Sequence, residues 1–180
     1  MSRSGYTDDI DDNWRHIMWR GRVASSIRGK RGQAMLRELL EALDAMSDKR
    51  LYPNSFATAS GEYCTLGVLG AARGTKMDDL GDAEDGCDER LVAERFGVAS
   101  PLAQEIMYMN DERVDNYKFV GIEICGPVRP YYPEYGSHKK TINMPDDAAP
   151  QRRWKVMRDW VAKQIKNTEA AHSIKEKNNG

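Results

Sequence analysis

The chain has 180 residues, 40% of them hydrophobic, and a formal net charge of −1. This length suits one domain with a real core, and the near-zero net charge excludes a global attraction to nucleic acid or to membranes. We find no apolar run long enough to cross a bilayer, and the polar, acidic N-terminus is unlike a signal peptide. The composition therefore predicts a cytoplasmic protein without membrane attachment.

Charge is distributed unevenly along the chain. Residues 1–50 contain 10 Lys and Arg against 8 Asp and Glu, residues 51–120 contain 6 against 13, and residues 121–180 contain 11 against 7. An acidic centre between basic ends indicates internal charge pairing, or a basic surface that stays shielded until a partner binds.

Two helices are predicted between residues 14 and 46, joined by a basic turn over residues 28–32. The second helix has one apolar side, formed by Met35, Leu36, Leu39, Leu40, Ala42, Leu43 and Met46. The first helix has two apolar stripes, Trp14, Ile17, Met18 and Ala24 on one side and Trp19, Val23 and Ile27 on the other. Such a helix has neighbours on both sides, or a neighbour on one side and a partner on the other. We expect the rest of the chain to pack around it.

Further elements are predicted in the remainder of the chain. Residues 64–74 read as a short buried helix that ends at Gly74, and Asp88, Ser100 and Pro101 mark the starts of two more. The expected elements are helices over 88–96, 101–109 and from Pro150 onward, with strands over 117–125 and 140–144.

The predicted fold is mainly α: a compact bundle of five or six helices with a small β-hairpin or strand pair inserted before the C-terminal helix. We expect a polar lead over residues 1–11, one helical domain over 12–167 with an aromatic, proline-rich insertion at 113–148, and a disordered tail over 168–180. The predicted core members are Trp14, Ile17, Met18, Leu36, Leu39, Leu40, Leu43, Leu66, Leu69, Ile106, Trp154, Met157 and Val161.

Several short motifs follow one another along the chain in a recognisable order. They are Met-Ser-Arg-Ser-Gly-Tyr at the N-terminus, Trp-Arg-Gly-Arg-Val at 19–23, Arg-Gly-Lys-Arg-Gly-Gln at 28–33, Cys-Thr-Leu-Gly at 64–67 and Met-Asn-Asp-Glu at 109–112. Over residues 1–112 and the last helix, the chain resembles small uncharacterised proteins encoded by tailed phages and prophages. The resemblance implies a phage product in the bacterial cytoplasm and no particular catalytic residues. Such small non-virion proteins often bind a host macromolecule, which is an argument by analogy.

Two surfaces are candidates for binding. The basic turn offers Arg28, Lys30 and Arg31 beside glycines, which suits contact with phosphates or acidic groups, although the charge pattern favours a solvated turn that pairs with the chain's own acids. The loop after the first strand offers Tyr131, Tyr132 and Tyr135 between prolines, which suits a protein contact or a cover over the edge of the core.

Nucleic-acid binding is the main alternative. It would use the turn together with exposed cations on the first and last helices, Arg15, Arg22, Arg152, Lys155, Lys163 and Lys166. Residues 89–109 fit a helix-turn-helix pattern, but the helix that would read DNA carries Gln104, Glu105 and Tyr108 on its expected outer side and has no cation.

Cys64 is the weak candidate for catalysis. A helix N-terminus can activate a thiol, but a nucleophile also needs a base, and the histidines are His16, His138 and His172. The other cysteines, Cys87 and Cys125, form no Cys-x-x-Cys motif with it, so we predict reduced thiols, no disulfide framework, no metal site and no cofactor. Asn110, Asp111 and Glu112 are expected to end a helix and not to bind a metal ion.

The sequence therefore favours a non-enzymatic phage accessory protein that binds and modulates a host or phage macromolecule, with a protein as the first choice of partner. Nucleic-acid binding is the second reading, and a small cysteine-dependent enzyme is the third.

Overall fold

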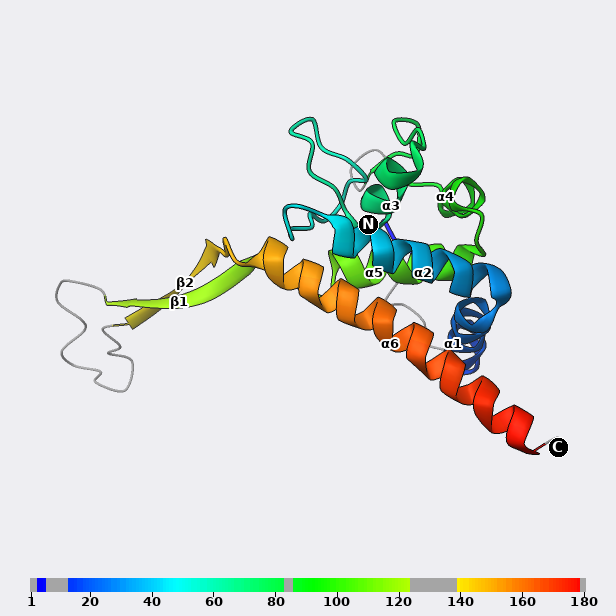
Figure 1. The fold of residues 1–180 in the computed structure, drawn as a ribbon. Helices are drawn as coiled ribbons and strands as arrows, with labels where there is room; N and C mark the ends of the chain where they lie inside the picture. Colours follow the sequence, from blue (N-terminus) through cyan, green and yellow to red (C-terminus); the bar gives the residue numbers. More distant parts are fainter. Residues whose placement is uncertain (1–2, 6–12, 83–85, 124–138, 179–180) are drawn as a thin grey trace. The chain divides into compact units, whose positions relative to one another are not determined.

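The computed structural model describes residues 3–5, 13–82, 86–123 and 139–178 (Figure 1). Within these residues it contains six helices and a two-stranded antiparallel sheet. Their bounds are α1 Asn13–Arg28, α2 Lys30–Ala45, α3 Thr65–Arg73, α4 Glu89–Phe96, α5 Ser100–Asp111, β1 Tyr117–Glu123, β2 Lys139–Pro145 and α6 Ala149–Asn178. The prediction of a mainly helical chain with a strand pair before the last helix is confirmed.

The chain divides into two compact units. The first comprises residues 1–114 and 150–180 and holds the helices, and the second comprises residues 115–149 and holds the strand pair. The second unit nearly coincides with the insertion expected at 113–148. The described residues of this unit are held together by the pairing of β1 with β2.

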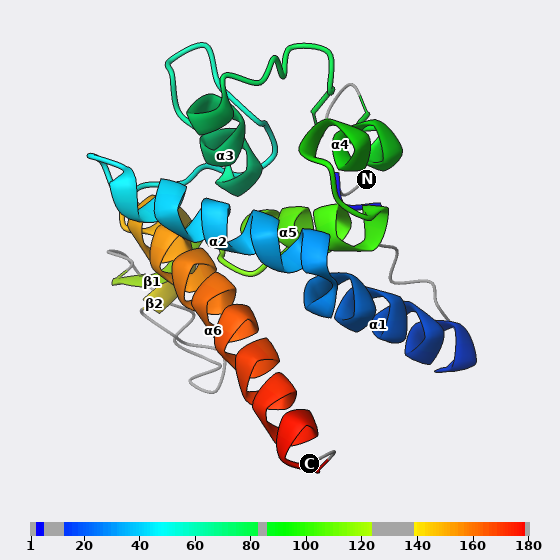
Figure 2. The same cartoon turned by 45° about the vertical axis from the view of Figure 1, so that its right-hand side comes forward.

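α5 lies at the centre of the helical unit. It contacts α1, α3 and α4, and Figure 2 shows it behind α2. Every residue from Leu102 to Met107 is buried, and so is Asn110. Gln104 and Glu105, expected on the outside of a DNA-reading helix, are therefore inside. A helix covered on all sides cannot enter a DNA groove, so the helix-turn-helix pattern of α4 and α5 serves packing.

The prediction that α1 holds this central position is wrong. Its buried residues are Val23 and Ile27, on the stripe that also contains the half-buried Trp19. Trp14, Ile17 and Met18 are 66%, 59% and 46% exposed. The core takes one of the two apolar stripes of α1 and leaves the other facing solvent. Sequence periodicity reveals both stripes but does not say which one finds a neighbour.

α2 and α6 run antiparallel across the core (Figure 1). Near the end of α2, the indole Nε1 of Trp154 donates to the carbonyl oxygen of Leu43, 3.1 Å away, and Arg158 Nε lies 2.7 Å from Asp44 Oδ1. Toward the start of α2, Arg37 pairs with Glu169. This order of contacts places the apolar sides of both helices face to face.

Most of the other predicted core residues lie in the core. Leu40 and Trp154 are half-buried and pack against it. The fully buried members of the prediction are Leu36, Leu39, Leu43, Leu66, Leu69, Ile106, Met157 and Val161. The structure adds residues from the loops and from α4, including Leu51, Phe56, Leu80, Val92 and Phe96.

Both chain ends differ from expectation. Arg3 and Ser4, placed in a loose polar lead, are buried. At the other end, α6 continues to Asn178 where a disordered tail was expected from residue 168. Thr168 is buried, and its hydroxyl donates to the carbonyl oxygen of Gln164, so the buried side of α6 extends beyond Ile165.

α3 forms where the glycines of its sequence allow loops to approach it. A Cβ on Gly67 would lie 1.7 Å from the carbonyl oxygen of Phe56, and one on Gly70 would lie 2.2 Å from Met77 Sδ. Both glycines therefore let loop residues approach α3 closely. The helix ends at Gly74 in the left-handed conformation, with φ of 64°, as predicted.

Arg153 is a buried cation that the sequence analysis did not single out. It lies on α6 and donates to three backbone carbonyl oxygens, those of Asn110 (2.7 Å), Val114 (2.8 Å) and Leu51 (3.2 Å). One guanidinium thus joins the start of α6 to the end of α5 and to the loop after α2.

The strand pair has a regular register. Tyr117 pairs with Pro145 and Glu123 with Lys139, with five pairs between them. Side chains alternate between the two faces. Tyr117 and Phe119 share one face, and Val120 and Ile122 share the other. Apolar residues therefore occupy both faces of a sheet that has only two strands.

Candidate functional site

The α1–α2 junction is tightly constrained by its glycines. Gly29 is the only residue between the two helices and has an extended backbone, with φ of −66° and ψ of 151°. A Cβ on Gly32 would lie 2.0 Å from the carbonyl oxygen of Ser26, so only glycine allows the chain to cross here. The buried Gln33 fixes the turn by donating from Nε2 to the carbonyl oxygen of Ile27, 2.8 Å away.

This junction presents Arg28, Lys30 and Arg31 to solvent, as the sequence analysis expects. No side chain caps the start of α2, and its first turn contains no acidic residue. Cations at a helix N-terminus oppose the helix dipole, and an anion there is favoured. The local arrangement is therefore unfavourable by itself and becomes favourable when a negatively charged group binds.

The junction belongs to a longer cationic stretch. Between Asn13 and Arg37 the sequence contains no Asp or Glu and seven cationic residues, Arg15, Arg20, Arg22, Arg28, Lys30, Arg31 and Arg37. Two of the seven form ion pairs inside the helical unit as the structure describes it: Arg20 pairs with the buried Glu105 at 3.3 Å, and Arg37 pairs with Glu169. Arg15 and Arg22 are exposed, like the three cations of the junction.

A groove of about 280 Å³ separates α1 from the second half of α6. α1 contributes Val23, Ile27 and Arg28 to its lining, among others, and α6 contributes Trp160 and Gln164. The basic junction and α6 are therefore neighbours, but an aromatic ring and amide side chains lie between them.

The cations of α6 lie on another side of that helix. Arg152, Lys155, Lys163 and Lys166 are exposed and share one stripe by helical spacing. None of the four is among the described residues that line the groove. The exposed Asp159 interrupts their stripe. The structure thus does not join the two halves of the predicted nucleic-acid surface into one uninterrupted row of cations.

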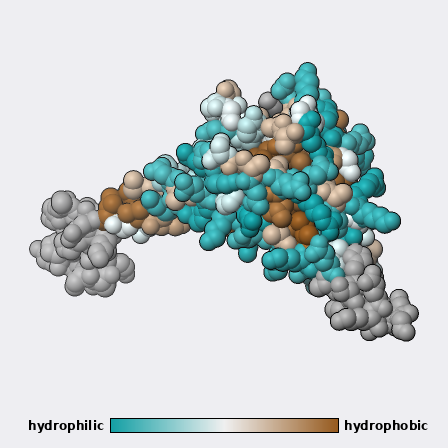
Figure 3. Space-filling model, viewed as in Figure 1, coloured by the Kyte–Doolittle hydropathy of each residue, from teal (hydrophilic) through white to brown (hydrophobic). Residues whose placement is uncertain are grey.

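The predicted aromatic contact residues, Tyr131, Tyr132 and Tyr135, lie outside the described residues. The strands that lead to them do expose large apolar side chains: Phe119 is 79% exposed and Tyr117 is 56% exposed. Figure 3 shows hydrophobic surface over this strand pair, whereas hydrophilic colouring prevails over most of the helical unit seen from the same side.

The Asn110-Asp111-Glu112 segment forms a structural network. Asn110 Oδ1 accepts from both the backbone nitrogen (3.0 Å) and the hydroxyl (2.7 Å) of Thr65, and Asn110 Nδ2 donates to the carbonyl oxygen of Tyr52. Asp111 accepts two hydrogen bonds of 3.0 Å from the buried Arg3. The segment ends α5 and holds α3 and the N-terminus in place.

Arg3 also approaches Cys64, with 3.7 Å between its Nη1 and the sulfur, and lies over the ring of Phe56 at 4.6 Å. Burial opposes its charge, but Cys64 and Asp111 outweigh this effect and raise the pKa of Arg3 above its usual value. Removing Asp111 would leave this buried charge without its carboxylate partner, which is costly.

Cys64, the candidate nucleophile, is 1% exposed and caps α3 by accepting from the backbone nitrogen of Gly67 at 3.4 Å. Of the described histidine side chains, His16 lies exposed on α1. Burial raises the pKa of the Cys87 thiol to about 11, which keeps it protonated at neutral pH. A nucleophile must reach its substrate, and the sulfur of Cys64 is occupied by structural contacts.

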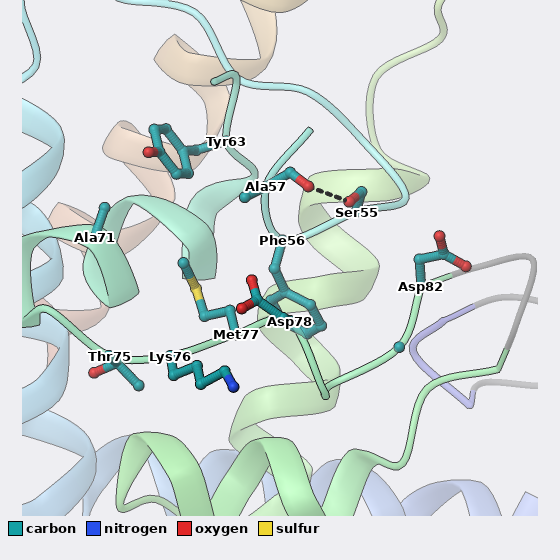
Figure 4. Close-up of a pocket in the computed structure, with 11 residues that line it drawn as sticks. Ser55, Phe56, Ala57, Tyr63, Ala71, Thr75, Lys76, Met77, Asp78 and Asp82 are labelled. Atoms are coloured by element: carbon teal, nitrogen blue, oxygen red, sulfur yellow. Dashed lines mark hydrogen bonds between the residues drawn. The ribbon is translucent and has the colours of Figure 1, made fainter. Parts of the chain in front are cut away.

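A larger cavity, of about 460 Å³, lies beside α3 (Figure 4). Phe56, Met77 and Asp78 line it, together with Ser55, whose hydroxyl donates to the carbonyl oxygen of Ala57. Neither a histidine nor a cysteine occurs among the described lining residues. The charged side chains in its described lining are two carboxylates, Asp78 and Asp82, and one lysine, Lys76.

In the described part of the chain, no cluster of three or more His, Cys, Asp or Glu side chains is placed to hold a metal ion. The described helices also include none with the length and apolar character required to cross a bilayer.

Comparison with protein-family models, with curated proteins and with solved structures gave no match. The candidate site is therefore defined by its own geometry: a cationic helical junction that continues into an exposed apolar stripe on α1.

Proposed function

We propose that this protein is a non-enzymatic accessory protein that binds and modulates a macromolecule of a phage or its bacterial host, with a protein as its partner. The observation that carries the proposal is the gathering of large exposed apolar side chains at two places. Trp14, Ile17 and Met18 stand together on α1, and Tyr117 and Phe119 stand together on β1. Exposed apolar residues that gather in patches mark contact surfaces, and Trp, Tyr and Arg are the residues most enriched at interface hot spots.

The basic junction supports the same proposal. Lys30 and Arg31 lie in the first turn of α2, which has no acidic side chain, and a binding partner with negative charge would offset this unfavourable arrangement. The phage context and the bacterial cytoplasm come from the sequence resemblance and belong to the proposal.

The experiment is affinity capture from bacterial lysate with three forms of the full chain. They are the wild type, a variant with Arg28, Lys30 and Arg31 replaced by Ser, and a variant with Tyr131, Tyr132 and Tyr135 replaced by Ala. We expect the wild type to retain a protein that at least one variant loses. A variant with the exposed Arg90 and Arg113 replaced by Ser is the charge control and should capture as the wild type does. Retention of nothing above background contradicts the proposal, and equal retention by all forms excludes the basic junction and the three tyrosines as the contact sites.

Nucleic-acid binding is the second candidate because the stretch from Asn13 to Arg37 contains seven cations and no acid. It predicts binding of duplex or single-stranded DNA or of RNA that weakens steeply with salt, because counterions are released from the phosphates. Replacing Lys155, Lys163 and Lys166 by Ser should reduce the salt dependence. Capture that persists after nuclease treatment of the lysate favours the protein partner.

A further inference from the structure

The outward stripe of α1 lies opposite the stripe that packs into the core. Trp14 and Val23 are nine positions apart, which on an α-helix is a rotation of about 180°. Val23 is 2% exposed, while Trp14 is 66% exposed. Ile17 and Met18 follow Trp14 at the three- and four-residue spacing that places side chains on one helical side. A helix that is held by one side and apolar on the other presents a ready-made contact surface.

Gly21 and Ser25 continue this stripe, seven and eleven residues after Trp14. A Cβ on Gly21 would meet nothing within 4 Å, so no element in the described part of the chain requires this exposed helical position to lack a side chain. Glycine in a helix interior costs about 1 kcal/mol relative to alanine. What it offers is a shallow place beside the large side chains, into which the backbone of another helix can approach closely.

The positive charge of α1 indicates which kind of helix could bind there. α1 contains no acidic residue, and the exposed Arg15, Arg22 and Arg28 flank or continue the stripe. Arg20, on the remaining side, is paired with Glu105. A second copy of α1 would bring like charges together and is disfavoured. Nucleic acid would satisfy the arginines but makes little use of the aliphatic side chains of Ile17 and Met18.

We propose that the outward face of α1, formed by Trp14, Ile17, Met18 and Gly21 with Arg15, Arg22 and Arg28 at its margins, binds an acidic amphipathic helix of a partner protein. This inference rests on the proposed function and specifies the chemistry of the partner. Trp14 supplies the aromatic anchor, Gly21 admits the partner's backbone, and the arginines pair with carboxylates at the edge of the contact.

The test is a selection of helical peptides of random sequence, displayed as a library, against the full-length protein. We expect the enriched peptides to combine apolar residues at helical spacing with Asp and Glu on the flanks. Their dissociation constants are then measured for the wild type, Trp14→Ala, Gly21→Leu and, as the control, Arg90→Ala on α4. The first two variants should weaken binding tenfold or more, and the control should leave it within about twofold.

Gly21→Leu is the decisive variant because it separates binding from folding. Its side chain enters open space and improves helix propensity, so helical circular dichroism and the melting temperature should be retained or rise. Full-strength peptide binding by Gly21→Leu overturns the inference. So do a library without binders, enriched peptides that are not acidic, and peptides displaced by duplex DNA or by vesicles of anionic lipid.

Failure of this inference is distinguishable from failure of the proposed function. If lysate capture depends on Arg28, Lys30 and Arg31 but is unchanged by Trp14→Ala and Gly21→Leu, a protein partner binds elsewhere and only the α1 face is excluded. If lysate capture fails for every form of the chain, the proposed function fails as well.

Discussion

Arg153 shows how a single buried residue can organise several elements. Its guanidinium is buried without exposed surface and donates to carbonyl oxygens in three separate segments. Burial lowers the pKa of Arg153, while the charge of Asp111 opposes that effect. Arginine suits this position because its planar group offers several donors in fixed directions.

Arg153→Met should therefore destabilise the helical unit strongly. Methionine fills similar volume but leaves three buried carbonyl oxygens without these donors, at about 1–3 kcal/mol for each group that stays unpaired. We expect a loss of about 3–5 kcal/mol in the free energy of unfolding, measured by urea denaturation. Lys155→Met, at an exposed position of the same helix, should change stability by less than about 0.5 kcal/mol. Equal effects of the two variants would contradict this role for Arg153.

The pair between Asp44 and Arg158 makes a prediction about pH. The hydrogen bond from Arg158 holds the pKa of the Asp44 carboxyl below its usual value. Because the pKa of Asp44 is lower in the folded state than in the unfolded state, ionised Asp44 stabilises the fold at pH values above its unfolded-state pKa. This stabilisation is lost as the pH falls through the folded-state pKa. Arg158→Met should return the pKa of Asp44 toward about 3.9, as followed by NMR titration of the carboxyl carbon.

Asp79 provides the internal control for that titration. Arg95, which lies on α4, donates an equivalent hydrogen bond to the Asp79 carboxylate and lowers the pKa of Asp79. The pKa of Asp79 should be the same in the wild type and in Arg158→Met. A shift of both carboxyls would indicate a global change in structure instead of the loss of one pair.

Among the elements, the α1–α2 junction depends on a glycine that packing requires. Gly32→Ala places a methyl group against the carbonyl oxygen of Ser26 and should destabilise the protein by about 1–3 kcal/mol, because the backbone must shift to relieve the overlap. Gly21→Ala, on α1 and in open space, should be neutral or stabilising by up to about 1 kcal/mol. Both are measured by urea denaturation. The opposite ranking of the two variants would show that the crossing of the helices is not as described.

The elements also show where local sequence signals suffice. The strand pair was predicted from β-branched and aromatic residues, the end of α3 from Gly74 and the start of α4 from Asp88. The structure confirms these positions, with Asp88 accepting from the backbone nitrogens of Arg90 and Leu91. Such signals act within one turn of the chain, so they do not depend on the rest of the fold.

At the scale of the whole molecule, the division into two units makes a prediction. Val114 and Pro150, the residues that bound the second unit, are both fixed to the helical unit. Arg153 donates to the carbonyl oxygen of Val114, and the backbone nitrogen of Leu51 donates to that of Pro150. Replacing residues 116–147 by a short Gly/Ser linker should therefore leave the helical unit folded, with a free energy of unfolding within about 1 kcal/mol of the wild type.

Circular dichroism and urea denaturation of the shortened chain test this division. Loss of the helical signal, or a much lower urea midpoint, would show that residues 116–147 are needed to complete the helical core. The strand pair alone is not expected to be stable, since two-stranded sheets are marginal in water.

The candidate site was predictable only in part. Arg28, Lys30 and Arg31 stand exposed because three cations beside two glycines interrupt the apolar spacing, and this interruption is visible in the sequence. The burial of Arg3 was not visible, because its partner Asp111 is 108 positions away and pairing at that distance leaves no local pattern. Gln104 and Glu105 were expected to be exposed, because the residues near them in the sequence do not indicate that other helices cover them.

The sequence by itself determined where helices and strands form, because periodicity, caps and turn residues act over a few positions. Only the tertiary structure decided that α5 and not α1 is the central helix, and that α1 buries the stripe of Val23 and Ile27 and exposes that of Trp14, Ile17 and Met18. An amphipathic pattern indicates that one side of a helix is apolar enough to be buried. Which sides are buried depends on how all helices share one core, and that competition is settled between residues far apart in the chain.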